Sequence, residues 1–266
     1  MHKRTDAQGF IFCHKPVEYG IWDNALYTPL EVGAALRSEH MCELRDDMGK
    51  DNLSEFNAFL AETSGTYWIW KNHSKDAKYI LQCQYRRRLE FPENQDFDEL
   101  FKDFDVIAAS PLMYTHATVW GQYGACHCLG DMELVQEIIK DRYPEYNEDF
   151  EKWVKCGSWQ FYANGFVMRA EDFDRYCKWL FTILREFLQR KGWIHMGAVR
   201  KEIEKDIREG RRVSTDGKKM VDVEDAVRYQ SQVGGFLSER LLGLYLLHNF
   251  GPKGIRCEDY KKFEGV

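Results

Sequence analysis

Residues 77–88, with the sequence AKYILQCQYRRR, constrain the fold of this chain more than any other stretch. A β-prone apolar run over residues 79–83 is followed at once by Gln84, Tyr85 and three consecutive arginines. This pattern is typical of a buried strand whose carboxyl end opens into a crevice, where α/β sheets bind ligands. Guanidinium groups match phosphate and carboxylate oxygens in pairs, so Arg86 and its neighbours predict an anion subsite. A solvated turn after an edge strand accounts for the pattern equally well.

Short apolar strands and amphipathic helices alternate along the rest of the chain, which predicts an α/β sheet protein. Strands are predicted at residues 9–13, 79–83 and 106–109, and helices at residues 53–62, 95–104, 131–142, 171–189 and 236–250. Residues 159–168 predict two strands around an Asn-Gly turn or bulge. The other segments are predicted to be irregular at 17–42, broken at Gly65, an exposed mobile insertion at 200–225, and a tail after 250.

The composition indicates a folded protein and argues against nucleic-acid binding. Hydrophobic residues make up 44% of the 266 positions, and the formal net charge is -6. Nucleic-acid binding depends on a broad basic face, which this charge does not favour. The eight cysteines form no C-x-x-C pair, as expected for free thiols in a reducing compartment. Without a signal peptide or an apolar run of about 20 residues, the chain is expected to be cytoplasmic.

Common nucleotide, hydrolase and metalloprotease motifs are absent from the sequence. Two D-x-D triplets, at residues 96–98 and 103–105, precede a strand instead of following one, so we interpret them as solvated helix positions. Adjacent Cys126, His127 and Cys128 do not have the spacing of zinc ligands. The sequence therefore predicts no metal site and leaves dependence on a divalent ion open.

Several sequence blocks occur together in an order that is specific, although each block alone is weak. They are His14–Lys15, DDMGKDNLS at 46–54, ETSGTYWIWKN at 62–72, CQYRR at 83–87, NGFVM at 164–168, YCKWLF at 176–181 and GFLSERL at 235–241. With them the chain resembles, over residues 10–248, the capsular-polysaccharide and lipopolysaccharide glycosyltransferase-like proteins grouped as domain of unknown function 4422. The family usually has histidine at the position of Gln84, so we expect this residue to be where the chain differs from its relatives.

The resemblance implies one GT-A-like, Rossmann-like domain over residues 1–266, with a central mostly parallel sheet flanked by helices. It also implies transfer of a sugar from a nucleotide donor, with a UDP-sugar expected, to a glycan or lipid-linked oligosaccharide. The product would be a surface polysaccharide such as capsule, exopolysaccharide or O-antigen.

The donor is expected over the carboxyl ends of the first two predicted strands. Asp46 or Asp47 and Asn52 are predicted to bind the nucleoside, and Lys71 and the arginines to neutralise the diphosphate in place of a metal. The full set of predicted donor-binding residues is His14, Lys15, Asp46, Asp47, Asn52, Asn57, Lys71, Asn72, Gln84, Tyr85, Arg86 and Arg87.

Glu239 is the predicted base that deprotonates the acceptor hydroxyl, with Asp172 as the second candidate. An alternative is that Glu239 and Arg240 are a capping pair at a helix start. The predicted acceptor-binding residues are His127, Asn164, Gly165 and Arg240.

Two other functions stay open at this point. The chain could be a non-catalytic protein of the same fold that binds sugar nucleotides or glycans, an idea that Gln84 motivates. A phosphate-ester hydrolase could use the same arginines, but the sequence offers no nucleophile or metal cluster for it.

Contact with the inner face of the membrane is a further hypothesis. It rests on the aromatic and basic residues Trp179, Phe181, Arg185, Arg190, Lys191 and Trp193. The favoured alternative is that the apolar side chains are core and the basic ones are solvated.

Overall fold

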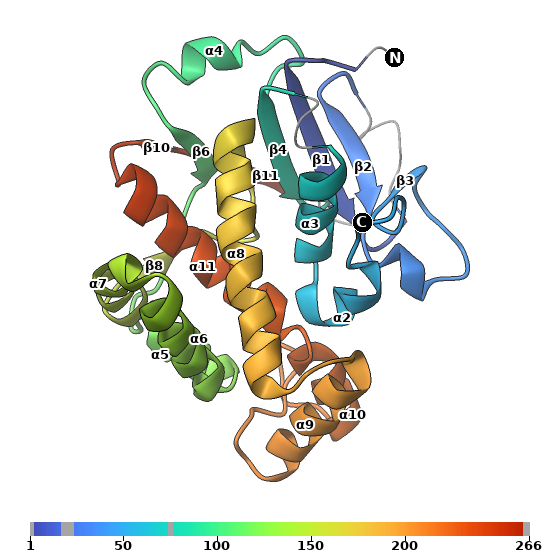
Figure 1. Ribbon diagram of the computed structural model, residues 1–266, viewed down its shortest axis with the longest axis vertical. Coiled ribbons are helices and arrows are strands. Elements are labelled where there is room, and N and C mark those ends of the chain that lie inside the picture. Colours follow the sequence, from blue (N-terminus) through green and yellow to red (C-terminus); the bar gives the residue numbers. More distant parts are fainter. Residues whose placement is uncertain (1–2, 17–23, 74–76, 263–266) are drawn as a thin grey trace.

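The structure, a computed structural model, describes residues 3–16, 24–73 and 77–262 (Figure 1). Its strands are β1 (Ala7–Cys13), β2 (Tyr27–Glu31), β3 (Leu44–Arg45), β4 (Tyr79–Gln84), β5 (Arg87–Leu89), β6 (Val106–Ala109), β7 (Leu112–Met113), β8 (Trp159–Gln160), β9 (Phe166–Arg169), β10 (Ile255–Glu258) and β11 (Tyr260–Lys262). Its α-helices are α2 (Asn57–Leu60), α3 (Thr63–Asn72), α4 (Phe97–Leu100), α5 (Val119–Cys126), α6 (Leu129–Arg142), α7 (Asn147–Asp149), α8 (Ala170–Lys191), α9 (Met196–Arg208), α10 (Val223–Gln230) and α11 (Val233–Phe250). Shorter 3₁₀ turns lie at Ala34–Leu36, Ser54–Phe56 and Pro144–Tyr146, and a π-helical turn lies at Phe150–Lys155.

The central sheet has the strand order β10-β6-β9-β4-β1-β2-β3. The pairs β10–β6, β4–β1, β1–β2 and β2–β3 are parallel, whereas β9 runs antiparallel to both β4 and β6. The short strands β5 and β11 pair with each other, and β5 also pairs with β4. The predicted α/β fold with a mostly parallel sheet is confirmed.

The central strands are apolar throughout because both of their faces are covered. In β1, Phe10 and Phe12 belong to one core cluster, and Ile11 and Cys13 belong to the other. This division follows from the two-residue repeat of a strand, which points successive side chains to opposite faces. Buried central strands of this kind are what the run at residues 79–83 predicted.

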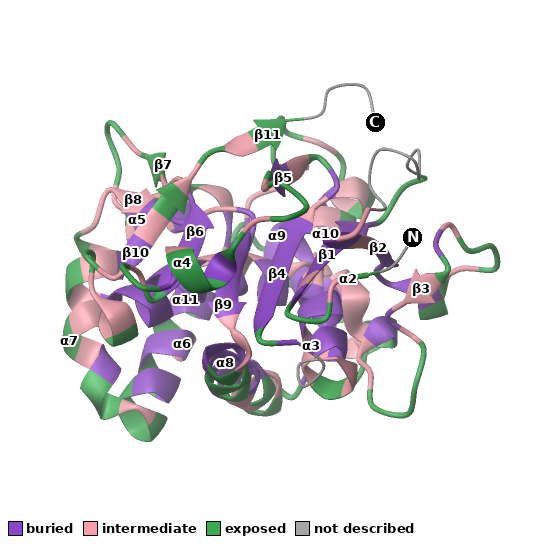
Figure 2. Cartoon of the chain, turned by 90° about the horizontal axis from the view of Figure 1, so that it is seen from above, coloured by how far each residue is buried: buried purple, intermediate pink, exposed green. Residues whose placement is uncertain are grey.

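Helices cover one face of the sheet, and a smaller layer covers the other. In Figure 2, α3 and α8 lie below the sheet, and β5 and β11 lie above it. The second face is completed by α4, whose Phe97 ring packs 5.6 Å from the Tyr79 ring. The carboxyl end of β4 is therefore left between the helical layer and the β5–β11 ribbon.

Two predicted breaks in secondary structure are wrong. Gly65 lies inside α3, where the absence of a side chain lets the helix pack closely on β1. Residues 17–23 of the segment predicted to be irregular lie outside the described residues, and the remainder, 24–42, contains a parallel strand, β2, despite its Pro29. That proline is tolerated because β3 pairs only with Leu30 and Glu31, so β1 is its only neighbouring strand among the described residues.

The segments near the carboxyl terminus are more ordered than the sequence predicted. The supposed mobile insertion at 200–225 contains most of α9 and the start of α10, and its Arg212 is paired with Asp131 with both side chains fully buried. The supposed tail supplies β10 and β11 to the sheet. The two strands predicted at 159–168 form, but β8 pairs with β7, while β9 enters the central sheet.

The hypothesis of membrane contact through α8 and the following Trp193 is not supported, because these aromatic side chains belong to the core. Trp179, Phe181 and Trp193 are buried. Lys191 forms an ion pair with Glu202 at 2.7 Å. Within the described residues, no helix combines the length and apolar character needed to cross a bilayer.

The close packing of α3 on β1 generates a test. A Cβ at Gly65 would lie 2.7 Å from Cε1 of Phe12 and 2.8 Å from Cγ1 of Val32. We expect Gly65→Ala to lower the free energy of unfolding by about 1–3 kcal/mol, since this overpacking outweighs the gain in helix propensity.

Urea denaturation measures the change, and Gly243→Ala in α11 is the matched control. A Cβ at Gly243 would lie 3.7 Å from Cδ2 of Phe161, an ordinary contact distance. The control should be neutral or stabilising by up to about 1 kcal/mol. Equal effects of the two substitutions would contradict the packing argument.

Candidate functional site

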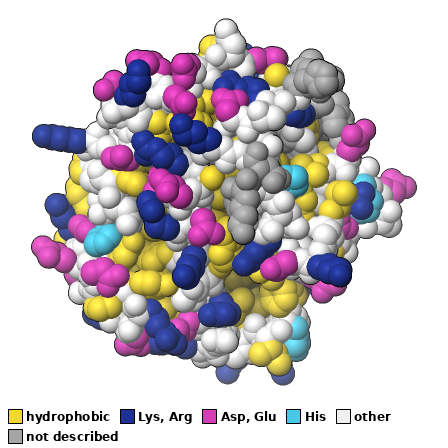
Figure 3. Space-filling model, turned by 45° about the horizontal axis from the view of Figure 1, so that its top comes forward, with side chains coloured by type: hydrophobic (Ala, Val, Ile, Leu, Met, Phe, Trp, Pro, Cys, Tyr) yellow, Lys and Arg dark blue, Asp and Glu magenta, His cyan; other side chains and the backbone are white. Residues whose placement is uncertain are grey.

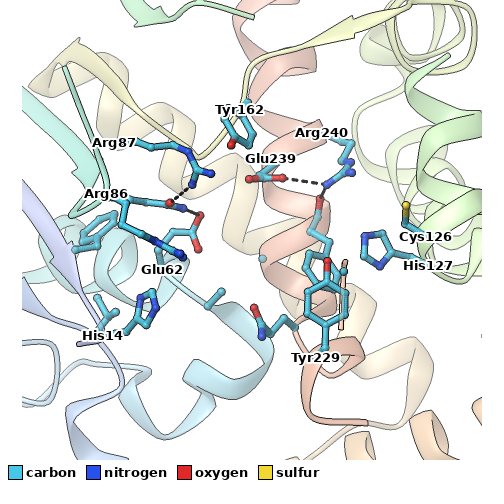
Figure 4. A pocket seen from close by; sticks show the side chains of 18 of the residues that line it. His14, Glu62, Arg86, Arg87, Cys126, His127, Tyr162, Tyr229, Glu239 and Arg240 are labelled. Carbon is cyan, nitrogen blue, oxygen red and sulfur yellow. Dashed lines mark hydrogen bonds and ion pairs between the residues drawn. The ribbon is translucent and has the colours of Figure 1, made fainter. Parts of the chain in front are cut away.

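A cavity of about 710 Å³ lies at the carboxyl ends of β1 and β4, facing helix α11 (Figure 4). His14 follows β1, Gln84 ends β4, and Glu239 projects from α11 on the opposite wall. Eight of the residues predicted for the site line this cavity: His14, Asn57, Gln84, Arg86, Arg87, His127, Glu239 and Arg240.

The arginines that follow β4 separate into two environments. Arg86 and Arg87 line the cavity, where the Arg87 guanidinium lies 4.6 Å from the centre of the Tyr162 ring and donates to Oε1 of Gln84 at 3.2 Å. Arg88 is 7% exposed and pairs with Glu90 at 2.8 Å. Arg87 and Arg88 differ because both belong to β5, and neighbouring residues of a strand face opposite ways.

Positive charge dominates the cavity wall. Five arginines and two glutamates line it, although the whole chain carries a net charge of -6. On the face seen in Figure 3, by contrast, Lys and Arg side chains are interspersed with Asp and Glu. A concave site with a local excess of guanidinium groups favours an anionic ligand.

Glu239 lies near the middle of the cavity, between the side chains contributed by the sheet and those contributed by α5 and α10 (Figure 4). Its Oε1 accepts from the Ala163 backbone N–H at 3.1 Å, and its Oε2 pairs with Arg240 at 3.1 Å. Burial raises the pKa of Glu239, and the Arg240 guanidinium opposes that shift. Both residues are well inside α11, so the alternative of a capping pair at a helix start is wrong.

Glu62, which the sequence did not single out, faces the same space. Its Oε1 accepts from Nε2 of Gln84 at 2.8 Å and from Nδ2 of Asn164 at 3.2 Å. The negative charge of Glu62 also contributes to the raised pKa of Glu239. The only available signal was its place at the start of the ETSGTYWIWKN block.

His127 is held inside the wall, 5% exposed, by stacking and hydrogen bonding. Its ring stacks on Phe236 with centroids 4.0 Å apart, and its Nδ1 lies 3.2 Å from Oε1 of Gln230. Burial, and then the nearby Arg240, lower the pKa of His127 from 6.5 to about 3. The imidazole is therefore neutral at physiological pH.

His14 is exposed at the cavity rim, with its ring packed edge-on against Tyr85 at 4.8 Å. Partial burial of the ring, followed by the charges of Arg86, Lys15 and Arg37, lowers the pKa of His14 to about 4. His14 can therefore offer a neutral hydrogen-bonding group beside the arginines.

Ten predicted residues lie outside the cavity wall: Lys15, Asp46, Asp47, Asn52, Lys71, Asn72, Tyr85, Asn164, Gly165 and Asp172. Asp46 is fully buried. Its carboxylate accepts from the backbone N–H groups of Gly33 and Ala34 at 2.9 and 3.0 Å, and from the Ser54 and Ser64 hydroxyls at 2.5 and 2.6 Å. Four internal hydrogen bonds occupy the oxygens that were predicted to contact a nucleoside, so Asp46 serves the local fold.

Most of the other residues outside the wall are engaged with neighbours. The contacts are Asp47 with Arg45 at 3.0 Å, Asn52 with the Ser54 N–H at 3.2 Å, Lys71 over the Trp70 ring at 3.5 Å, Asn72 with the Trp68 carbonyl at 2.9 Å, Asp172 with Arg169 at 3.8 Å, and Tyr85 with His14 at 3.4 Å. Lys15 is exposed, and a side chain at Gly165 would meet the hydroxyl of Tyr260. Asn164 lies beneath the cavity and orients Glu62.

No group of three or more His, Cys, Asp or Glu side chains with the geometry of a metal site occurs among the described residues. The two D-x-D triplets lie around α4, where Asp96 caps the helix and Asp98 binds Lys78 at 2.6 Å. The guanidinium groups of the cavity wall suit an anionic group such as a phosphate.

The fold just described is similar to that of a known glycosyltransferase. The chain is similar to the apo structure of the bifunctional glycosyltransferase WbbM, with a TM-score of 0.73 and 22% identity over 98% of this chain and 46% of that one. A much weaker likeness, with a TM-score of 0.28 and 9% identity, relates 65% of the chain to 60% of the mannosyltransferase Ktr4p from S. cerevisiae.

The chain belongs to the family described as Domain of unknown function (DUF4422), whose model matches residues 9–201. This confirms the family resemblance that the sequence blocks indicated. The GFLSERL block at 235–241 lies beyond the matched region. No curated protein matches the chain, and the chain spans less than half the length of WbbM.

The buried imidazole predicts a pH dependence of stability. Between pH 6.5 and about 3 the unfolded chain binds a proton on His127 that the folded chain excludes. The free energy of unfolding should therefore fall as pH decreases through this window, by roughly 5 kcal/mol when the window is crossed completely. Urea denaturation at several pH values should show this component in the parent protein and not in His127→Phe, which keeps a ring against Phe236. An identical pH slope in both proteins would rule it out.

Proposed function

We propose that this chain transfers a sugar from a nucleotide-sugar donor, with a UDP-sugar expected, to a glycan or lipid-linked acceptor during assembly of a surface polysaccharide. The observation that carries the proposal is the arginine-rich cavity at the carboxyl ends of β1 and β4 in a glycosyltransferase fold. Strand ends of this kind are where α/β sheets bind nucleotides. The similarity to WbbM, a bifunctional glycosyltransferase, supports the class of reaction.

The donor diphosphate is assigned to Arg86 and Arg87. In the described part of the chain, no carboxylate lies within ion-pair distance of either guanidinium. Both can therefore bind phosphate oxygens without first breaking an ion pair, and they stabilise the negative charge that grows on the leaving nucleoside diphosphate. A divalent ion, if the reaction needs one, would add charge stabilisation at the same phosphates.

Glu239 is assigned as the base in an inverting transfer. It removes the proton of an acceptor hydroxyl while that oxygen bonds to the anomeric carbon, and the bond from that carbon to the phosphate oxygen breaks. The raised pKa of Glu239 brings this carboxylate closer to the pKa of an effective general base at neutral pH. Glu62, directed by two amide groups, is placed to accept hydrogen bonds from the sugar being transferred.

The arginine assignment predicts a loss of donor affinity. Removing Arg86 or Arg87 deletes charge-assisted hydrogen bonds worth about 1.5–3 kcal/mol, so each alanine variant should bind UDP and UDP-sugars roughly 10- to 100-fold more weakly. Calorimetric titration measures the affinity. Arg185→Ala, an exposed arginine on α8, is the matched control and should bind like the parent protein. Unchanged affinity and turnover in Arg86→Ala would refute the phosphate role.

The base assignment predicts a loss of turnover that is separate from binding. We expect Glu239→Gln to slow transfer about 10²- to 10⁴-fold while UDP still binds, because the amide cannot take the proton. The assay follows nucleotide release from a panel of sugar nucleotides and acceptors, with and without Mn²⁺.

Glu62→Gln and the parent protein are measured beside it. If Glu62→Gln loses turnover and Glu239→Gln does not, the base is wrongly assigned. Saturable binding of a sugar nucleotide by the parent protein without transfer to any acceptor would instead indicate a non-catalytic binding protein.

A further inference from the structure

Residues 209–232, which lie beyond the region matched by the family model, are fixed against the body of the molecule. The Arg212 guanidinium binds the Asp131 carboxylate at 2.8 Å, and neither side chain is exposed. Nε2 of Gln230 donates to the carbonyl oxygens of Cys126 at 2.8 Å and Val213 at 3.1 Å. These bonds fix the segment against the end of α5 and the start of α6. The position of the segment beside the cavity is therefore set by specific buried contacts.

The same segment supplies part of the cavity wall, namely Gly217, Arg228, Tyr229 and Gln232. The half-buried Tyr229 ring lies 5.0 Å from Phe236 and 6.0 Å from His127, measured between centroids. These three rings form an aromatic wall. Figure 4 shows Tyr229 and His127 across the cavity from His14 and Arg86, with Glu239 between the two sides.

Charge is distributed unequally between the two sides. On the side of the aromatic wall, Arg228 pairs with Asp225 at 2.8 Å, and Arg240 pairs with Glu239 at 3.1 Å. On the opposite side, Arg86 and Arg87 have no carboxylate partner among the described residues. The uncompensated positive charge therefore lies where the donor phosphates are assigned, and the aromatic side is close to electrically balanced.

We propose that the aromatic wall of Tyr229, Phe236 and His127 is the acceptor subsite, and that it takes an uncharged sugar ring stacked on Tyr229. The inference rests on the proposed transferase function and gives it an acceptor class. A pyranose ring covers an aromatic face with its C–H groups, and the hydroxyl aimed at Glu239 is the one that reacts. The carboxylate of an acidic sugar would have no unpaired guanidinium to bind on this side, because Arg228 and Arg240 each form an ion pair with a carboxylate of the protein.

The test uses pairs of probes that differ only at C6: the methyl glycosides of glucose, galactose and mannose, and the uronate counterpart of each. Binding is titrated by saturation-transfer NMR with saturating UDP, which occupies Arg86 and Arg87. At least one neutral glycoside should bind, and more tightly than its uronate. Tyr229→Ala should weaken that binding about three- to tenfold through lost ring contact, whereas Tyr229→Phe, which keeps the ring, stays within about twofold.

Asp225→Asn makes the complementary change, since it leaves the Arg228 charge uncompensated. The variant should bind the uronates about two- to fivefold more tightly than the parent, the size expected for an exposed pair, with the neutral sugars unchanged.

Four results would overturn the proposal. The parent protein could bind no neutral glycoside, or could bind the uronates more tightly than their neutral counterparts. Tyr229→Ala could leave glycoside binding unchanged, or Asp225→Asn could leave uronate binding unchanged. Failure of the transferase function would show separately, as absent binding and turnover of UDP-sugars in a protein that still selects neutral rings.

Discussion

A network of hydrogen bonds between the sheet and the helical layer holds the cavity floor, and the rest of the site depends on it. The Asn164 amide donates to Glu62 at 3.2 Å and to the Ser238 hydroxyl at 3.0 Å, and that hydroxyl lies 2.9 Å from Oγ1 of Thr63. From β4, Gln82 donates to the Asn164 carbonyl at 2.8 Å. A shift of α3 or α11 relative to β4 would break some of these bonds and leave buried polar groups without a partner. Because that costs free energy, the network holds the two helices in place relative to the strand. The relative positions of Glu62 and Glu239 are therefore set by the fold.

The same network includes Gln84 at the carboxyl end of β4. Gln84 donates to Glu62 at 2.8 Å and accepts from Arg87 at 3.2 Å. The amide group of Gln84 thus uses both its donor and its acceptor to join Glu62 to Arg87. Because an amide cannot acquire a positive charge, Gln84 makes this link without adding a titratable group to the cavity.

The sequence pattern predicted those helices and strands that are determined by residues within the segment itself. The helix α8 and the strand β6 were found because amphipathic spacing or a bounded apolar run marks each of them. The strands β2, β10 and β11 were missed, since each of them forms by pairing with strands that the local pattern does not reveal. For the site, Arg86 and Arg87 were predicted from a strand end, whereas Asp46 was misplaced. A carboxylate that binds ligand and one that accepts four internal hydrogen bonds have the same letter in the sequence, and only the coordinates of their partners distinguish them.

Two parts of the chain must be combined to complete the cavity. The side assigned to the donor is built from residues inside the region matched by the family model, but Tyr229, Glu239 and Arg240 lie beyond it. What joins the two parts is specific: the Ala163 N–H binds Glu239, and Asn164 binds Ser238 one residue earlier on α11. Ala163 and Asn164 hold positive φ angles of 61° and 49°, an unusual backbone that directs these groups toward α11. The unusual backbone at Ala163 and Asn164 thus fixes the position of Glu239, the carboxylate assigned as base, relative to β4, after which the residues assigned to the phosphates follow. This fixed relative position is a physical reason for both parts to occur in one chain.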